Sequence, residues 1–131
     1  MSAEENVELV EKFYEEAINQ KDGTACERLL TDDFVHNSEF KGRAGQQEAV
    51  DAFLTGFPDL EVKVLMTVAE DDKVATHQKW KGTHEGEFIG IPATGKKVEF
   101  TSTAILIVHQ GMIAQAWDEV DLFGLSAQLN A

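Results

Sequence analysis

The sequence predicts an α+β domain in which helices come first along the chain and long strands follow. Apolar residues recur at helical spacing as far as Thr55, whereas from Leu60 onward they alternate with a period of two. Chains that segregate helices and strands in this way form separate layers. Long, strongly curved antiparallel strands can wrap around the helices, so we expect a cone whose open end holds a pocket. A chain of 131 residues suits one hydrophobic core, and residues 1–131 are taken as a single domain.

Three helices are expected in the first half of the chain. The first begins at Ser2, because Glu5 three positions later completes a capping-box pattern. The second covers residues 24–30, and the third covers about 43–55 before Pro58 ends it. A short strand over 34–38 lies between the last two helices, after a turn at 31–33, and a fourth helix over 122–129 closes the chain.

Two long strands over 60–69 and 73–83 open the second half. In the first, alternation places four apolar side chains on one side: Val62, Val64, Met66 and Val68. In the second, Lys79 and Lys81 give the odd-numbered side a solvent-exposed character, so Gln78 and Trp80 are expected to face the interior.

A hairpin joins the last two strands, over 98–108 and 112–120. Its loop has either two residues, Gln110-Gly111, or three, with Gly111 left-handed in a bulged turn. The choice fixes the register and therefore which side chains face the core. We expect the three-residue loop, which pairs Val108 with Met112, because it separates a nearly pure apolar face from a mixed one. The apolar face then holds Phe100, Ser102, Ala104, Leu106, Val108, Met112, Ala114, Ala116, Asp118 and Val120.

Asp118 is the one charged residue on that face, opposite Ser102 in the expected register. Burying an unpaired carboxylate is expensive. One interpretation is a structural aspartate whose oxygens are bonded by backbone groups or a threonine hydroxyl. The other is an acid/base group at the bottom of a pocket, with a pKa raised by its apolar surroundings.

Several further side chains are candidates to line the pocket. Trp80 and Gln78 can form a stacking wall and a polar clamp for a ring-shaped ligand, although a plain core tryptophan is an equal alternative. His36 is either a pocket residue or a partly exposed surface histidine. Tyr14 is either core or has its hydroxyl at the rim. The remaining candidates are Phe100, Ser102, Ala104 and Ala116.

The opposite face of the hairpin has no helices left to cover it. It carries four large apolar side chains, and such patches usually mark interfaces. We therefore expect a homodimer through the backs of the sheets, formed by Ile105, Ile107, Ile113 and Trp117.

The overall charge excludes some classes of partner. A net charge of −13 argues against nucleic acid and against anionic membrane surfaces. No apolar run approaches the length of a membrane span, and the acidic N-terminus shows no signal peptide, so a cytoplasmic protein is expected. Cys26, the one cysteine, is expected to be a small core residue rather than a nucleophile. The four scattered histidines form no metal-ligand set.

The segment 82–95, the turn Gln110-Gly111, the pair Trp117-Asp118 and the stretch 121–129 resemble the SnoaL-like polyketide cyclase (ester cyclase) family. The resemblance covers nearly the whole chain and implies the nuclear-transport-factor-2-like cone fold. It also implies intramolecular aldol cyclisation without a cofactor, with the catalytic aspartate at Asp118. A glutamine, a histidine and an asparagine of the family pattern are replaced here by Ser102, Ala104 and His36.

The leading functional hypothesis is a small cofactor-independent enzyme. Asp118 would act as general base or acid beside a carbonyl of an apolar small molecule, with His36 as a second catalytic residue. The candidates to stabilise the developing oxyanion are His36, Gln78 and Tyr14. Aldol cyclisation, double-bond isomerisation and epoxide hydrolysis all fit one carboxylate in an apolar cone. The alternatives are a non-catalytic binding module for an apolar ligand and a dimerisation domain.

Overall fold

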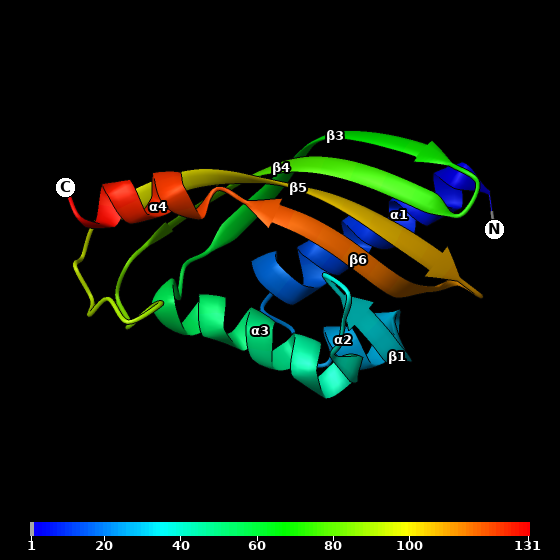
Figure 1. The fold of residues 1–131 in the computed structure, drawn as a ribbon, viewed down its shortest axis with the longest axis horizontal. Coiled ribbons are helices and arrows are strands. Elements are labelled where there is room, and N and C mark those ends of the chain that lie inside the picture. The colour runs from blue at the N-terminus through cyan, green and yellow to red at the C-terminus, as the bar shows by residue number, and fades with distance from the viewer. Residues whose placement is uncertain (1) are drawn as a thin grey trace.

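The structure, a computed structural model that describes residues 2–131, is a curved, unclosed sheet with helices on its inner side (Figure 1). The helices are α1 (Ala3–Tyr14), the π-helical turn η1 (Glu15–Asn19), α2 (Ala25–Leu29), α3 (Gly42–Gly56) and α4 (Leu122–Leu129). The strands are β1 (Leu30–His36), β2 (Glu39–Phe40), β3 (Glu61–Glu70), β4 (Lys73–Thr83), β5 (Lys97–His109) and β6 (Met112–Val120). Their order in the sheet is β2-β1-β6-β5-β4-β3. The predicted α+β cone is confirmed.

Helix α1 begins as the sequence predicts. The Ser2 hydroxyl accepts from the backbone N–H of Glu5 at 3.1 Å, and the Glu5 carboxylate accepts from the Ser2 backbone N–H at 3.0 Å. The helix continues into η1, whose last residue fixes it to the sheet. Asn19 donates to the carbonyl of Val62 on β3 and accepts from its N–H, at 3.0 and 2.8 Å. The helical layer is therefore tied to β3 at a defined register.

Strand β1 begins earlier than predicted and lies beside the last strand of the chain. The expected turn at 31–33 is wrong, because these residues continue the strand that starts at Leu30. β1 runs parallel to β6, with His36 beside Ala116, and this pairing satisfies backbone groups that a turn would leave unpaired. The first and last strands along the chain are thus neighbours in the sheet.

The hairpin between β5 and β6 has the shorter of the two expected loops. His109 pairs with Met112, and Gln110 and Gly111 adopt φ of 50° and 77°, as a two-residue type I′ turn requires. Val108 then pairs with Ile113, and Ala114 is the extra residue of a bulge. The three-residue loop is therefore wrong.

Two consequences follow from this register. Ile113 is fully buried in the core instead of lying on the outer face, and Asp118 pairs with Ala104 instead of Ser102. Beyond the bulge, Ala116, Asp118 and Val120 share the inner face with the even-numbered residues of β5, as predicted.

A second bulge divides β3. Val62 and Val64 face inward, but the register shifts between Val64 and Met66. Met66 and Val68 consequently lie on the outer face, where they are exposed. The prediction that all four share one side is wrong past the bulge. On β4, Gln78 is completely buried, as predicted from the exposed lysines on the other side of the same strand.

The loop between β4 and β5 is packed against the end of α3 by aromatic contacts. Phe88 from this loop lies 4.9 Å from Phe53 and 5.2 Å from Phe57, measured between ring centroids. Gly86 approaches the Thr55 carbonyl so closely that no Cβ would fit there. Cys26 is buried in the core, and burial, with a smaller effect of the Asp51 charge, raises the pKa of its thiol to about 12.

Candidate active site

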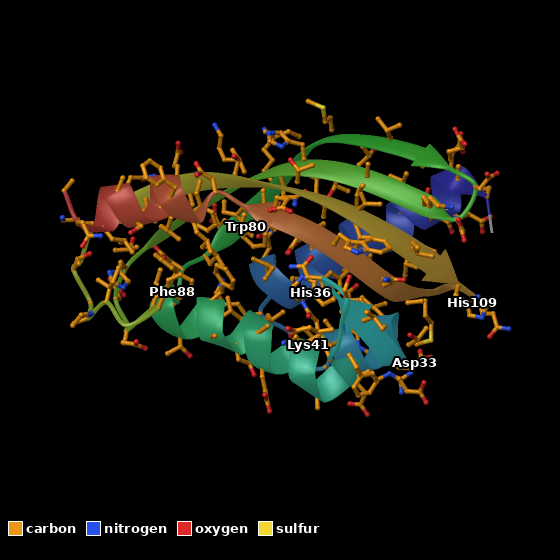
Figure 2. The ribbon with its side chains drawn as sticks, viewed as in Figure 1. Asp33, His36, Lys41, Trp80, Phe88 and His109 are labelled. Atoms are coloured by element: carbon orange, nitrogen blue, oxygen red, sulfur yellow. The ribbon has the colours of Figure 1, made fainter. Side chains whose placement is uncertain are left out.

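A cavity of about 110 Å³ lies between the inner face of the sheet and the helices α1 and α3. Most of its wall is apolar. Eight of the nine predicted site residues line it: Tyr14, His36, Trp80, Phe100, Ser102, Ala104, Ala116 and Asp118. The structure therefore brings these residues together from α1, β1, β4, β5 and β6. In Figure 2 the labelled His36 and Trp80 lie between the sheet and α3, whereas His109 lies at the far hairpin.

Two consecutive residues hold Asp118 at the cavity wall: His36, the last residue of β1, and Asn37, which follows it. The Oδ1 atom of Asp118 lies 3.0 Å from His36 Nε2 and accepts a hydrogen bond from Asn37 Nδ2 at 3.1 Å. The backbone N–H of Asp118 donates to Asn37 Oδ1 at 2.9 Å. Among residues 2–131, no hydrogen bond to Oδ2 is found, so this oxygen remains available for a ligand.

The pKa of Asp118 lies below its ordinary value. Burial alone would raise this pKa, but the hydrogen bond and charge of His36, together with Asn37, outweigh burial and lower it. The expected raised pKa is therefore wrong, because the carboxylate has partners that the apolar pattern of its own strand did not reveal. Asp118 is a carboxylate at neutral pH and a weak base.

The sequence reasoning missed two polar site residues, the cavity-lining Gln46 of α3 and Asn37. Asn37 has φ of 49°, in the left-handed region, where asparagine is more acceptable than most residues. Its backbone N–H also donates to the carbonyl of Ala116 at 2.9 Å. The pair Asn37-Ser38 at the end of a strand is a turn signal that could have marked this position.

Gln78 is the predicted site residue that does not line the cavity. Its Nε2 donates to the hydroxyl of Ser102 at 2.6 Å, and the two residues are directly paired on the inner face of the sheet. Trp80 Nε1 donates to the same hydroxyl at 2.8 Å. Gln78 thus supports Ser102 and does not clamp a ligand directly.

One side of the cavity is an aromatic wall of Trp80 and Phe100. The rings of Trp80 and Phe100 are parallel within 1°, with centroids 6.0 Å apart. Phe53 of α3 is stacked at 6.2 Å from Trp80, and Tyr14 meets Trp80 edge-on at 6.1 Å. A planar apolar ligand would find extensive contact against such a surface.

Tyr14 presents a neutral phenol in this wall. Burial raises its pKa to about 12, with a smaller lowering effect of the hydrogen bond to Thr76 and a still smaller raising effect of the Asp118 charge. The phenol therefore stays protonated at neutral pH and can act as a hydrogen-bond donor.

The other histidines lie away from the cavity. His77 is on the outer face and contacts the Thr103 hydroxyl at 2.9 Å, and His84 is buried in the loop after β4, beside Thr94. No three His, Cys, Asp or Glu side chains within residues 2–131 gather as a metal site would require. None of the helices in this range is both long and apolar enough to cross a bilayer.

Known structures share this architecture over nearly their whole length. TsrD from Streptomyces laurentii is 29% identical, with a TM-score of 0.90 and coverage of 100% of this chain and 98% of that one. AclR from Streptomyces galilaeus is 27% identical, with a TM-score of 0.89 and coverage of 98% of both chains. IdmH from Streptomyces antibioticus is 27% identical, with a TM-score of 0.85 and coverage of 96% and 99%.

At the level of sequence, no curated protein matches the chain. The family model described as SnoaL-like polyketide cyclase matches residues 8–129. That match extends from α1 to the end of α4 and agrees with the resemblance carried by the hairpin and its preceding loop. The chain belongs to the SnoaL-like polyketide cyclase family.

Proposed function

We propose that the protein is a cofactor-independent enzyme in which Asp118 transfers a proton at a carbon beside a carbonyl group of an apolar, ring-bearing small molecule. The observation that carries this proposal is a carboxylate in the wall of a mostly apolar cavity, with one oxygen, Oδ2, that has no hydrogen-bond partner within residues 2–131. Such a reaction suits aldol cyclisation or double-bond isomerisation. It is supported by the family and by IdmH, which is described as a candidate polyketide cyclase.

The geometry gives each polar residue a distinct part. His36 and Asn37 hold Oδ1 and the backbone of Asp118, which leaves Oδ2 to approach the ligand. The aromatic wall of Trp80 and Phe100 would orient a planar ring. Proton transfer by a positioned carboxylate typically contributes ~10²–10⁴-fold to a rate.

The proposal can be tested without knowing the natural substrate. We choose 2-tetralone, an apolar bicyclic ketone, and measure exchange of its α-hydrogens for deuterium by NMR. Asp118→Asn should lower the protein-dependent exchange rate by ~10²-fold or more. Glu119→Gln is the matched control, since it removes the neighbouring carboxylate, which lies on the outer face opposite Thr103. Equal exchange by wild type and Asp118→Asn would refute the proposal.

The lowered pKa of Asp118 favours one second candidate, a binding module without chemistry, because a weak base removes a carbon-bound proton slowly. AclR, described as a candidate hydroxylase, also shows that this fold is associated with differing activities. A binding module would quench or shift the fluorescence of Trp80 on adding 2-tetralone but would exchange no hydrogens in either form.

We also propose that two copies associate through the outer faces of their sheets. Register places Val68, Ala75, Ile105 and Trp117 in one row across four strands. Together with Met66 and Ile107 they form what we name the outer apolar band. Val68 is 69% exposed and Ile105 is 47% exposed in the single chain. A second copy would bury this band against itself.

The charge of the outer face favours a second copy as its partner. The chain as a whole has a net charge of −13, but this face is nearly balanced. Its lysines and glutamates are Lys63, Lys73, Lys79, Lys81 and Lys97, against Glu61, Glu70, Glu99 and Glu119. The acidic excess therefore lies elsewhere, and two outer faces can meet without the repulsion that the net charge would suggest.

A further inference from the structure

Ser102 has an unusual set of hydrogen-bond partners for a hydroxyl beside a cavity. It is 4% exposed, on the inner face of β5. Its Oγ accepts from Gln78 Nε2 at 2.6 Å and from Trp80 Nε1 at 2.8 Å. Both partners come from β4, which lies beside β5, and both share the inner face with Ser102, so they approach the hydroxyl from the β4 side.

These two bonds determine what remains for the Ser102 proton. A hydroxyl offers two acceptor sites and one donor, and an indole N–H can only donate. With both acceptor sites occupied, the O–H is left to donate. Within residues 2–131, no protein atom accepts a hydrogen bond from it when the Gln78 amide donates through Nε2, an orientation in which the buried Gln78 Oε1 has no partner. Because Ser102 lines the cavity, its proton is directed toward the space that a ligand would occupy.

Ser102 and Asp118 are close enough for one small ligand to contact both side chains. Asp118 pairs with Ala104 and Ser102 pairs with Val120, so Ser102 and Asp118 are diagonal neighbours on one face. Diagonal pairs of this kind have Cα atoms roughly 7–8 Å apart. A carbonyl oxygen and its α-carbon fit between the two side chains, with a hydrogen-bond length of roughly 3 Å at each end. The small side chain of Ala104 leaves room for this arrangement.

We propose that Ser102 is the hydrogen-bond donor to the carbonyl oxygen of the substrate, and that the substrate class is ketones with an α-hydrogen directed at Asp118. This inference rests on the proposed function and adds to it the group that recognises oxygen. Oδ2 of Asp118 takes the α-proton, and the electron pair of the broken C–H bond forms the C=C bond of an enolate. The carbonyl π electrons move to oxygen, where the Ser102 O–H stabilises the negative charge.

The other polar groups explain why such a donor is needed. A carboxylate with a lowered pKa is a weak base, so enolate formation depends on stabilising the oxygen. His36 Nε2 is already directed at Asp118, and Gln78 Nε2 at Ser102. Ser102 offers a donor to the cavity, as do the neutral phenol of Tyr14 and the amide of Gln46, which also line it. Of these, Ser102 is the diagonal neighbour of Asp118.

The test uses 2-tetralone labelled with ¹³C at the carbonyl and two readouts, the infrared carbonyl band and deuterium exchange. In the wild type we expect the bound band at lower wavenumber than in hexane, as for a hydrogen-bonded carbonyl. In Ser102→Ala the band should return toward its hexane position, and exchange should fall about 10²-fold, as when one oxyanion donor is removed. Ser102→Thr retains a hydroxyl, so its bound carbonyl band should lie at the lower wavenumber of the wild type. Thr103→Ala, which removes an exposed hydroxyl from the outer face, should change neither readout.

Trp80→Phe provides a second variant that leaves Ser102 in place. It removes one of the two N–H groups that orient the hydroxyl, so the band should broaden and move part of the way toward its hexane position. A wild-type band at the hexane position would overturn the inference without any variant. A band unchanged in Ser102→Ala would overturn it as well. If exchange still depends on Asp118 in either case, the proposed function stands and only the role of Ser102 is lost. An absence of exchange in the wild type would overturn both.

Discussion

His36 Nε2 lies 3.0 Å from Asp118 Oδ1, although the two residues are 82 positions apart in the chain. The contact joins the first long strand to the last one, across the parallel pairing of β1 with β6. It also reverses the effect of burial on the carboxylate, so that the pKa of Asp118 is lowered. The acid/base character of the site is therefore set by a neighbouring strand.

The lowered pKa of Asp118 predicts how stability depends on pH. A group with a lowered folded-state pKa stabilises the fold above its unfolded value, and this contribution is lost as pH falls through the folded value. The difference in unfolding free energy between wild type and Asp118→Asn should therefore shrink between about pH 5 and about pH 3, around the ordinary aspartate pKa of about 3.9. Urea unfolding at both ends of this range measures it, and a constant difference would contradict the prediction.

Asn37 should matter through both its side chain and its backbone. Asn37→Gly keeps the left-handed conformation but removes the hydrogen bonds to Asp118, which should cost ~1–2 kcal/mol. Asn37→Ala removes the same bonds and adds the strain of φ 49°, roughly 1 kcal/mol more. Urea unfolding of both variants separates the two effects. An alanine variant as stable as the glycine variant would show that the backbone is not constrained there.

Enlarging Ala104 tests whether the space beside it can hold a ligand. Ala104→Phe should block binding of 2-tetralone while changing the melting temperature little, because the added ring enters the cavity. Ala25→Phe is the matched control, at a fully buried alanine outside the cavity, and should destabilise by ~1–3 kcal/mol or more through overpacking. Equal destabilisation by both changes would mean that the space beside Ala104 is already filled.

Trp117 tests the proposed dimer. Trp117→Glu places a charge within the outer apolar band and should weaken association at least roughly tenfold, or about 1.4 kcal/mol. Thr101→Glu adds the same charge to the same face, opposite Lys79 and away from the band, and should have a smaller effect. Sedimentation velocity over a range of concentrations measures both. A wild-type monomer at micromolar concentration would remove the proposal.

Alternation of apolar residues predicted the β4 and β5 faces correctly, because one parity holds along each of these strands. It failed where a bulge inserts a residue, at Ala114 in β6 and beside Leu65 in β3. A bulge reverses which residues of a strand face the core, yet the run of apolar residues continues through it. The alternation therefore predicts the wrong side of the sheet for Ile113.

The local sequence pattern also predicted most of the residues that line the cavity, but it did not predict the lowered pKa of Asp118. The residues around Asp118 on its own hairpin are apolar or small, and they alone predict a raised pKa. The residues that lower it, His36 and Asn37, come from a distant strand whose parallel placement beside β6 no local signal reveals. The site composition was thus accessible from sequence, whereas the charge state required the topology.

The parallel contact between β1 and β6 has a consequence for the order in which the molecule matures. Hairpin partners meet early, because few residues separate them, whereas β1 must wait for β6, which is synthesised after every other strand of the sheet. We expect a nascent chain that ends before β6 to contain the aromatic wall but to lack Asp118, the residue proposed to carry the chemistry. Reactivity would then appear in the final stage of folding, so that an incomplete chain cannot act on a ligand prematurely.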